Sequence, residues 1–288
     1  MNKLTTFLSL CLVVLISCND QQQKKTVVVK EIKQAPQRQQ PKSFTYQIAK
    51  AKQWLAANKD SNQLQIALAV NRTDKGGFVQ MDSVIIPTDM TGDVAYYLPF
   101  PLQAASLDSV DKIVLFSYPT QTFAAYENGI LMYTGPTNMG RKKDPTPTGL
   151  FYANWKAEKT TSTFNDEWDL KWNFNIENKE GVGWHQYALP GYPASHSCLR
   201  MQEKDARFMY DWADQWVLQG TDNVLANGTP VIVFGSYNFD APKPWLQLVT
   251  NPHALDITES EIQQQVAPYL NKILAEQEKR KAVVADKK

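Results

Sequence analysis

Residues 184–201 have the sequence WHQYALPGYPASHSCLRM. This stretch contains two of the three histidines of the chain, His185 and His196, together with the thiol of Cys198. An imidazole can accept the proton of a thiol and leave a nucleophilic thiolate, so the combination suits covalent acyl transfer. A metal site and ordinary packing are the alternatives.

His185 is the first candidate for the base. Val182 and Trp184 flank it in a strand-like run, and a strand would hold the imidazole in a fixed direction. A free thiol has a pKa of about 8.5, so Cys198 needs a neighbouring imidazole to form thiolate near neutral pH. His196 lies two residues before Cys198 and faces the same side if the segment is extended. An orienting role and a hydrogen-bonded structural role are both open for it.

A zinc site is the second hypothesis for the same residues. His185, His196 and Cys198, with a water in the fourth position, would suit catalytic zinc. Outside the N-terminal leader no other cysteine supports this site, and we expect no metal and no cofactor. The third histidine, His253, follows Asn251-Pro252 and is predicted to lie in a surface loop.

The N-terminus predicts export. An apolar run over residues 7–16 is too short to span a bilayer, so residues 1–17 are interpreted as a signal peptide. Ser17-Cys18, after two aliphatic residues, resembles the lipobox of bacterial lipoproteins. This resemblance implies cleavage before Cys18 and a lipid on its thiol. An ordinary secretory signal that is cleaved elsewhere is the alternative.

Cysteine usage and charge narrow the function. Cys11 leaves with the signal and Cys18 carries the lipid, which leaves Cys198 without an intramolecular disulfide partner. A lone thiol in an exported protein is a candidate reactive group. Removal of Lys3 takes the basic residues from 30 to 29, against 29 acidic residues. A balance of this kind gives no electrostatic footprint for nucleic acid.

The first part of the chain is predicted to be a tether followed by a small folded segment. Residues 18–43 are rich in Gln, Lys and Pro, so they cannot offset the entropy of becoming ordered. In residues 44–105, helical spacing predicts a helix over 44–55, and alternation predicts strands such as 64–70. The segment resembles small segments that precede catalytic domains in exported wall enzymes. We assign it no activity and expect it to pack against the main sheet.

A mainly β region is predicted over residues 106–236. Alternating apolar and polar residues over 168–176 predict a strand with one aromatic face, which is expected to be buried against the core. A continuous apolar run over 231–234 predicts a strand that is buried on both faces. Other apolar runs, with an Asn-Gly hairpin signal between the last two, predict strands at 112–116, 122–126 and 130–134.

Helical signals follow the thiol and close the chain. Apolar spacing over 206–216 predicts a helix that ends at Gly220. Residues 237–288 are predicted to form a helical extension, and Pro268 is expected to kink or split its helix. The charged end, residues 276–288, is predicted to be a solvated tail.

Two landmarks resemble the active-site signature of the L,D-transpeptidases of bacterial cell walls. That family has an upstream His and then a Ser-His-Gly-Cys run, followed by an aliphatic residue and Arg or Asn. The sequence SHSCLRM at 195–201 fits this pattern except at Ser197. The second landmark, a loop ending in Thr-Pro-x-Gly-x-Phe, is present at 146–151. The resemblance implies a mainly β catalytic domain, a β-sandwich or barrel with flanking helices, and an α+β chain overall.

The resemblance also implies a role for each residue of the motif. Cys198 is the nucleophile and His185 the general base and acid. Arg200 suits a substrate carboxylate or a structural acidic partner, and we favour a structural role that stabilises the loop under Cys198. The supporting residues are Ser195, His196, Ser197 and Arg200, and the substrate-binding residues are Trp184, Tyr187 and Gly149.

The implied substrate is the stem peptide of peptidoglycan. The Cys198 thiolate attacks the carbonyl of the third stem residue, releases the terminal D-alanine and forms a thioester. An amine of a second stem or of a protein resolves the thioester, whereas water as the acceptor makes the enzyme an L,D-carboxypeptidase. We expect a monomer in the bacterial cell envelope, facing the periplasm and anchored to the membrane by the lipid at Cys18, with no nucleic-acid partner.

Ser197 departs from the family pattern. A glycine beside the nucleophile allows a positive φ, or a close approach of the substrate to the backbone amides that bind the oxyanion. A Cβ at this position narrows the site or, at the extreme, marks a catalytically silent relative that binds peptidoglycan. Because the thiol, both histidines and Arg200 are kept, we expect an active enzyme.

Overall fold

The computed structural model describes residues 34–161 and 169–286. These described residues form one compact unit. The predicted signal peptide, the lipid site Cys18 and the first part of the tether, up to residue 33, lie outside the described residues. Within the described part, no helix is both long and apolar enough to cross a bilayer.

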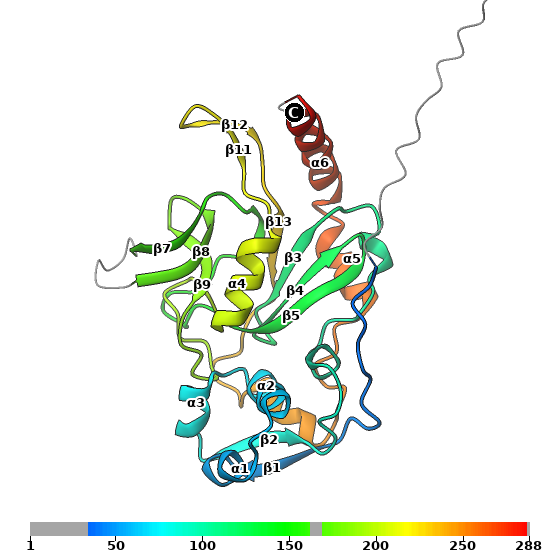
Figure 1. Ribbon diagram of the computed structural model, residues 1–288, viewed down its shortest axis with the longest axis vertical. Coiled ribbons are helices and arrows are strands. Elements are labelled where there is room, and N and C mark those ends of the chain that lie inside the picture. The colour runs from blue at the N-terminus through cyan, green and yellow to red at the C-terminus, as the bar shows by residue number, and fades with distance from the viewer. Residues whose placement is uncertain (1–33, 162–168, 287–288) are drawn as a thin grey trace, which may run out of the picture. The chain divides into compact units, whose positions relative to one another are not determined.

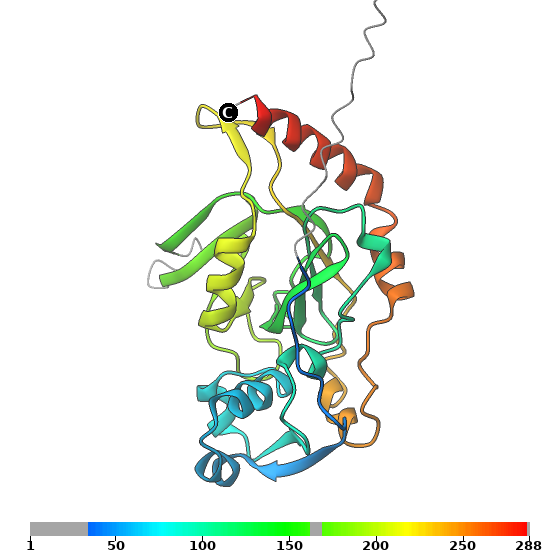
Figure 2. The ribbon, with the colours of Figure 1, turned by 45° about the vertical axis from the view of Figure 1, so that its right-hand side comes forward.

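A curled nine-stranded sheet organises the described chain, which is mainly β as the sequence predicts (Figures 1 and 2). The strand order is β6-β13-β3-β4-β5-β10-β9-β8-β7. Two neighbouring pairs, β13 with β3 and β10 with β9, are parallel. The edge strand β6 comes close to β8, which shows the curl. The strands are β3 (Ile113–Ser117), β4 (Thr122–Glu127), β5 (Ile130–Asn138), β6 (Gly149–Tyr152), β7 (Lys156–Thr161), β8 (Asp169–Glu177), β9 (Val182–Gln186), β10 (Leu199–Met201) and β13 (Pro230–Phe234).

The central strands are buried on both faces. In β3, Val114 and Phe116 pack into one apolar cluster, whereas Ile113 and Leu115 pack into another on the opposite side. Successive side chains of a strand point to opposite faces, so a strand between two clusters must be apolar throughout. This burial explains the continuous apolar runs and confirms the strands predicted at 112–116, 122–126, 130–134 and 231–234.

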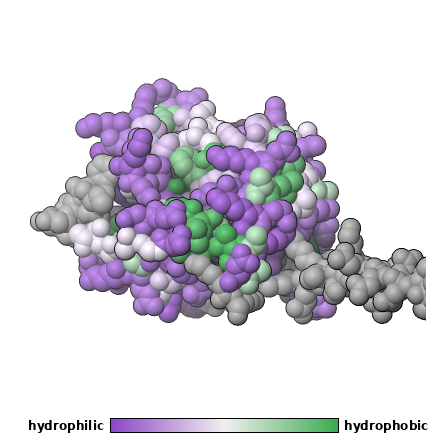
Figure 3. All heavy atoms as spheres, turned by 90° about the horizontal axis from the view of Figure 1, so that it is seen from above, coloured by the Kyte–Doolittle hydropathy of each residue, from purple (hydrophilic) through white to green (hydrophobic). Residues whose placement is uncertain are grey.

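Helices and a hairpin complete the two apolar layers (Figure 1). Helix α4 (Glu203–Trp212) contacts β8 and β9, and α5 (Glu259–Val266) contacts β13. Helix α6 (Leu270–Ala285) runs beside β12 (Asn223–Ala226), which pairs with β11 (Val217–Gln219). Viewed from above, this end of the molecule is largely hydrophilic, with hydrophobic residues gathered toward the middle (Figure 3).

The segment before the main sheet has its own small sheet and three helices. Strands β1 (Tyr46–Lys50) and β2 (Ser83–Pro87) pair antiparallel. The helices are α1 (Ala51–Ala57), α2 (Ser61–Val70) and α3 (Lys75–Gln80). Short 3₁₀ helices follow at Val94–Tyr97 and Ala105–Leu107, and a third lies at Pro244–Val249.

Two predictions in this segment are wrong. The predicted helix over 44–55 begins only at Ala51, because residues 46–50 pair with β2 as a strand. The predicted strand over 64–70 is the helix α2, whose first turn is capped by the Asp60 carboxylate accepting from the Gln63 N–H at 2.8 Å. All residues from 66 to 70 are buried, so the second half of this helix shows no polar face and its period is hidden in the sequence.

Two predictions after the thiol are also wrong. Helix α4 ends at Trp212 and not at Gly220, because residues 217–219 turn into the β11–β12 hairpin. Residues 276–285 are not a free tail but the second half of α6. Arg280 of this helix donates hydrogen bonds to the carbonyls of Gln215 and Asn227 at 2.9 and 3.0 Å. The expected break at Pro268 is confirmed, since it separates α5 from α6.

Residues 34–43 pack against the body, although their composition predicts a tether. Arg38 donates hydrogen bonds to the carbonyls of Leu131 and Met132 in β5, at 2.7 and 3.2 Å. The Gln39 carbonyl accepts from the Asp93 N–H at 2.8 Å. A stretch with few apolar side chains is thus held through hydrogen bonds to β5 and to the backbone of Asp93.

The strand predicted over 168–176 is confirmed as β8, but its regular alternation is not. Trp168 lies outside the described residues, and Trp172 has a φ of +54° at a shift in the pairing with β9. This irregularity turns Asn173 and Asn175 into the buried part of the sheet. The Asn175 amide donates to the carbonyl of Glu177 at 3.0 Å, which satisfies the buried polar group.

Candidate active site

Cys198 and His185 are placed by two neighbouring parallel strands. Strand β10 pairs with β9 so that Leu199 lies opposite Trp184 and Arg200 opposite His185. Side chains alternate along each strand, so His185 and Arg200 share one face with Cys198, which directly precedes β10. Trp184 and Leu199 point to the opposite face and enter the apolar core.

His185 is held as a neutral imidazole. Its side chain is buried, and Nδ1 lies 3.0 Å from the Gln186 carbonyl oxygen. A carbonyl only accepts, so Nδ1 carries the hydrogen and Nε2 keeps its lone pair. Burial lowers the pKa of His185 to about 4; the Gln186 hydrogen bond opposes this shift and the charge of Arg200 adds to it. The residue is therefore available as a base at neutral pH.

The thiol of Cys198 is half-buried and protonated at rest. Its Sγ is 3.9 Å from the Gly181 carbonyl oxygen, and among the described residues no hydrogen bond joins it to His185. Burial raises the pKa of Cys198, opposed by a hydrogen bond from the Gly183 backbone and by the charge of Arg200. Gly183 is needed because a Cβ there would lie 2.5 Å from the Phe174 carbonyl.

Arg200 and Tyr187 extend the face that carries His185. The Arg200 guanidinium lies over the Tyr187 ring at 4.5 Å, and that ring meets the His185 ring edge-on at a centroid distance of 5.9 Å. Burial lowers the pKa of Arg200, and Tyr187 and the Cys198 thiol partly restore it. Within the described residues no carboxylate forms an ion pair with Arg200, so the structural acidic partner considered from the sequence is not found there.

The chain turns sharply just before the nucleophile. Ser197 has a φ of +77°, in the left-handed region that glycine favours, so this serine adopts the backbone form expected of the glycine it replaces. For a non-glycine residue this conformation costs roughly 1–2 kcal/mol. The Ser195 hydroxyl closes the turn by donating to the Cys198 carbonyl at 2.6 Å, and the Ser197 hydroxyl donates to the His196 carbonyl. The segment is not extended at Ser197, so the condition under which His196 would face the same side as Cys198 is not met.

The loop after β5 supports this turn. The Thr146 hydroxyl accepts from the Gly140 N–H at 2.8 Å and donates to the Ser197 carbonyl at 2.7 Å. The Arg141 N–H donates to the Ser195 carbonyl at 3.0 Å. Thr146 belongs to the second sequence landmark, so the fold brings both landmarks into contact.

His196 lies in a basic neighbourhood at the edge of the site. Its Nε2 is 4.0 Å from the Asp144 carboxylate, which also binds Arg141 at 2.6 Å. The pKa of His196 is lowered, first by burial and then by the charge of Arg141, with Asp144 opposing the shift. His196 therefore lies within the turn that precedes Cys198, close to Asp144 and Arg141.

Of the residues predicted to bind substrate, Trp184 lies in the core, whereas the role of Gly149 stays a prediction. Trp184 is fully buried and packs on Phe174 and Phe116 at ring distances of 4.8 and 6.3 Å, so it is a core residue and cannot contact substrate in this arrangement. Gly149, with a φ of +121°, opens β6 beside the Tyr269 hydroxyl. The residue of its loop that reaches the thiol turn is Thr146.

The N-terminal segment contacts the loop between β9 and β10 through residues that the sequence does not single out. The Thr73 hydroxyl donates to the Leu189 carbonyl at 2.7 Å, and the Leu189 N–H donates to the Asp74 carboxylate at 2.7 Å. Gln202, after β10, donates to the Thr73 carbonyl at 3.0 Å. We call Thr73 and Asp74 the loop clamp. They bind Leu189, which lies in the loop that runs from β9, the strand of His185, to Cys198. The Asp74 carboxylate also caps helix α3, which is a common use of aspartate. The sequence therefore carries no signal for its contact with Leu189.

The zinc hypothesis finds no geometric support. Over residues 34–161 and 169–286, no three or more His, Cys, Asp and Glu side chains come together in a way that could hold a metal ion. His185, His196 and Cys198 are therefore not assembled as a ligand set.

Residues 111–233 match the family model of the L,D-transpeptidase catalytic domain. The matched range contains both landmarks and every motif residue from His185 to Arg200. No curated protein matches the chain.

Solved structures of L,D-transpeptidases are similar to part of the chain. An L,D-transpeptidase from Mycobacterium smegmatis has 20% identity over 44% of this chain and 59% of its own, with a TM-score of 0.35. One from Stackebrandtia nassauensis has 20% identity over 44% and 57%, with a TM-score of 0.36. L,D-transpeptidase 1 of Mycobacterium tuberculosis has 20% identity over 44% and 62%, with a TM-score of 0.34. The chain thus spans less than two thirds of the length of these proteins.

Proposed function

We propose that this protein is an L,D-transpeptidase that acts on peptidoglycan stem peptides through a thioester on Cys198. The observation that carries the proposal is the parallel pairing of β9 with β10, which sets His185, Cys198 and Arg200 on one face. The family match over residues 111–233 supports the class of reaction.

The first step is the transfer of the thiol proton. Because the pKa of Cys198 is raised and that of His185 is lowered, the resting pair is neutral and no thiolate is formed in advance. As Sγ attacks the carbonyl carbon of the third stem residue, its proton passes to Nε2 of His185. The imidazolium is short-lived in its buried position, so it is a strong acid for the next step.

The second step expels the terminal D-alanine. The bond between the attacked carbonyl carbon and the nitrogen of D-alanine breaks, and the proton on His185 passes to that nitrogen. The backbone N–H groups of Ser197 and Cys198 donate no hydrogen bond within the described residues, so we assign them to the oxyanion. The positive φ of Ser197 keeps the backbone form that a glycine would give these amides.

The thioester is then resolved by an acceptor. An amine of a second stem peptide gives an L,D-cross-link, an amine of a protein gives an attached protein, and water gives an L,D-carboxypeptidase. His185 takes the proton of the attacking group in each case, and Cys198 leaves as the thiol. Arg200, which has no acidic partner in the described part, is available for a carboxylate of the substrate.

The proposed location is the periplasmic side of the bacterial envelope. It rests on the apolar run over residues 7–16 and on the Ser17-Cys18 pair, which suit a lipoprotein signal. Labelling of the full chain with a radioactive fatty acid, compared with the Cys18→Ser variant, tests the anchor. Label that persists in the variant contradicts it.

The test of the reaction is incubation with tetrapeptide muropeptides and mass spectrometry of the products. Dimers, tripeptides or amine adducts, accompanied by free D-alanine, identify the acceptor. A carbapenem should also add covalently to Cys198. Cys198→Ala and His185→Asn should each abolish product. Cys198→Ser is the matched control for the shape of the site, because serine is close to cysteine in size. Binding of muropeptides without any product or adduct would instead identify a silent peptidoglycan-binding relative.

A further inference from the structure

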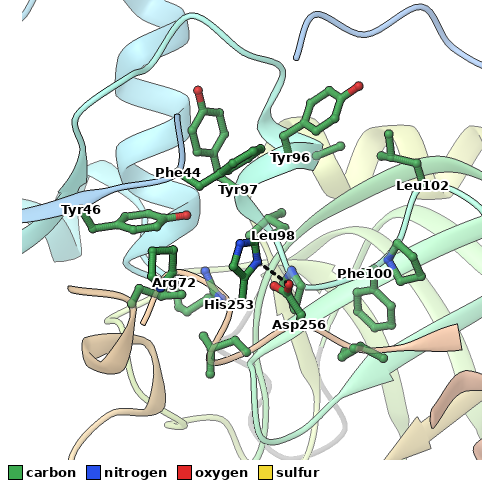
Figure 4. A pocket seen from close by; sticks show the side chains of 17 residues that line it. Phe44, Tyr46, Arg72, Tyr96, Tyr97, Leu98, Phe100, Leu102, His253 and Asp256 are labelled. Carbon is green, nitrogen blue, oxygen red and sulfur yellow. Dashed lines mark hydrogen bonds and ion pairs between the residues drawn. The ribbon is translucent and has the colours of Figure 1, made fainter. Parts of the chain in front are cut away.

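A cavity of about 250 Å³ lies outside the region matched by the transpeptidase family (Figure 4). Its lining comes from the start of β1, from residues 95–102 and from residues 248–257, with Arg72 added from the end of α2. None of these residues belongs to the stretch 184–201 or to residues 111–233. The cavity is therefore separate from the residues assigned to acyl transfer.

The walls of the cavity are largely aromatic. Figure 4 shows rings from three segments gathered around one space, with leucine and proline side chains between them. Phe44 packs on the ring of His253 at a centroid distance of 6.2 Å, which closes one side. Rings of this kind favour the apolar body of a small ligand. They are Phe44, Tyr46, Tyr96, Tyr97 and Phe100.

Arg72 supplies a buried positive charge to this space. The residue is only 1% exposed, and it takes a φ of +55° just after α2. Its Nε donates to the Thr120 carbonyl at 2.7 Å, and its Nη1 donates to the carbonyls of Ala69 and Val70 at 2.7 and 3.0 Å. In the part of the chain that the structure describes, Nη2 makes no hydrogen bond and no carboxylate pairs with the guanidinium.

An unpaired buried cation is unusual. Desolvation lowers the pKa of Arg72 to about 9, so the guanidinium is still charged at neutral pH, helped by the nearby Tyr46 hydroxyl. Neutral carbonyls and the Trp245 ring, 5.6 Å from Cζ, offset part of the cost of burying the charge. An anion beside Nη2 would offset the rest.

Other polar side chains also line the cavity. Tyr46 lies beside Arg72, and burial raises the pKa of its hydroxyl to about 12, so it is a neutral donor. Among the described residues its hydroxyl makes no hydrogen bond. Nδ1 of His253 lies 2.7 Å from the carboxylate of Asp256, and both residues line the cavity. The cavity thus offers two donors that make no hydrogen bond within the described residues, Arg72 Nη2 and the Tyr46 hydroxyl, together with the His253–Asp256 pair.

We propose that this cavity binds a small organic carboxylate, with the carboxylate group on Arg72 Nη2 and the Tyr46 hydroxyl and the apolar body among the aromatic rings. Nε and Nη1 of Arg72 are already bonded to carbonyls, so Nη2 donates to one carboxylate oxygen and the Tyr46 hydroxyl is the donor for the other. Free phosphate fits less well, since it needs donors on all sides and the walls here are apolar. The carboxylate can belong to a free organic acid or to the end of a peptide, and both present the same group.

Ligand-observed NMR on the full chain tests the proposal with two acids and their neutral amides. Benzoate represents a free acid, and N-acetyl-D-alanyl-D-alanine represents a peptide end. Each acid should bind at least about tenfold more tightly than its amide, because a charge-assisted hydrogen bond is lost in the amide. The acid that binds more tightly shows whether the carboxylate comes from a free organic acid or from the end of a peptide. Equal binding of acid and amide, or no binding of either acid at millimolar concentration, would overturn the proposal.

Variants locate the binding. Tyr46→Phe removes one hydroxyl and should weaken benzoate several-fold, while Arg72→Lys should weaken it by at least about tenfold. Arg207→Gln, a change at an exposed arginine on α4, is the control and should leave binding unchanged. If Arg72→Lys does not fold, the Nε–H resonance of Arg72 in the unmodified protein should shift on addition of benzoate. A resonance that stays in place while benzoate binds contradicts the site. Cys198→Ala should bind benzoate as tightly as the unmodified chain, so this result is independent of the proposed transpeptidase reaction.

Discussion

The Thr146 hydroxyl bridges Gly140 and Ser197, with a 2.7 Å hydrogen bond to the carbonyl of the residue that precedes the nucleophile. Thr146→Val removes this hydroxyl and leaves a buried N–H and a buried carbonyl unpaired. We expect a loss of about 2 kcal/mol in the free energy of unfolding, measured in urea. Acylation of Cys198 by a carbapenem should also slow, because the turn is released. Thr146→Ser keeps the hydroxyl and should restore both quantities; equal defects in the two variants would refute this role.

Replacing Ser197 by glycine tests the strained turn. The left-handed φ of Ser197 costs roughly 1–2 kcal/mol in a serine, while glycine adds about 0.5–1 kcal/mol of chain entropy to the unfolded state. The free energy of unfolding of Ser197→Gly should therefore be equal or higher by up to about 1 kcal/mol. The acylation rate should be equal or faster. Ser197→Ala keeps the backbone cost and loses only the hydroxyl. If alanine and glycine behave alike, the hydroxyl matters and the backbone does not.

The buried His185 predicts an unusual pH profile. Its pKa of about 4 leaves the imidazole neutral well below the range in which an ordinary histidine gains its proton. The carbapenem acylation rate should show no loss between pH 7 and pH 5.5, and it should rise on the alkaline side as Cys198 loses its proton. An inflection near pH 6.5 that disappears in His185→Asn would contradict the neutral buried imidazole.

The same pKa has a consequence for stability. A histidine whose pKa is lowered on folding binds fewer protons in the folded state. The contribution of His185 to the free energy of unfolding is therefore fully present above the unfolded pKa. It falls as the pH drops from about 6.5 toward 4, by up to roughly 3 kcal/mol. The effect should be missing in His185→Asn when unfolding is measured in urea across this range.

The loop clamp should act on the chemistry and not on stability alone. Thr73→Val removes the hydrogen bond to Leu189, whereas Thr73→Ser keeps the hydroxyl. We expect Thr73→Val to lower the carbapenem acylation rate about tenfold or more, since a shift of the connection displaces His185 from Cys198. Thr73→Ser should return most of the rate. Equal acylation rates in the two variants, in samples shown to be folded, would limit Thr73 to packing.

The buried carboxyl group of Asp205 should lower the free energy of unfolding as the pH rises. Its side chain is fully buried, Tyr133 donates to Oδ1 at 2.7 Å, and Oδ2 finds no partner among the described residues. Burial raises the pKa of Asp205 to about 6, so the folded state holds its proton from about pH 4 to pH 6 and loses stability as the pH rises through this window. Relative to the unmodified chain, Asp205→Asn should gain about 2–3 kcal/mol between pH 4 and pH 7. Asp211→Asn, at an exposed position of the same helix, should show no such gain.

Local signals were sufficient for the central sheet and for part of the candidate site. The runs that form β3, β4 and β13 are apolar because both faces are covered, and this property is visible in the sequence without knowing the partners. The Asn128-Gly129 pair, with φ values of +49° and +74°, forms the tight turn that its composition predicts. Cys198 and His185 are visible in the sequence because an imidazole near a thiol suits covalent acyl transfer.

Other features depended on partners that are distant in the sequence. The segment 64–70 alternates like a strand, yet it folds as part of helix α2, in which residues 66–70 are all buried. Trp184 and His185 are neighbours in sequence, yet the pleat sends one into the core and the other to the face that carries Arg200. The loop clamp joins Asp74 to Leu189 over a separation of 115 residues.

The sequence by itself determined which groups can react and which strands build the core, because both follow from residue type and short-range period. The tertiary structure decided which of those groups meet. Parallel pairing of β9 with β10 brings His185 to the face of Cys198, and Thr146 fixes Ser197 in a conformation that a serine seldom adopts. Pairing and burial are non-local, since their free energy depends on surfaces supplied by segments far along the chain.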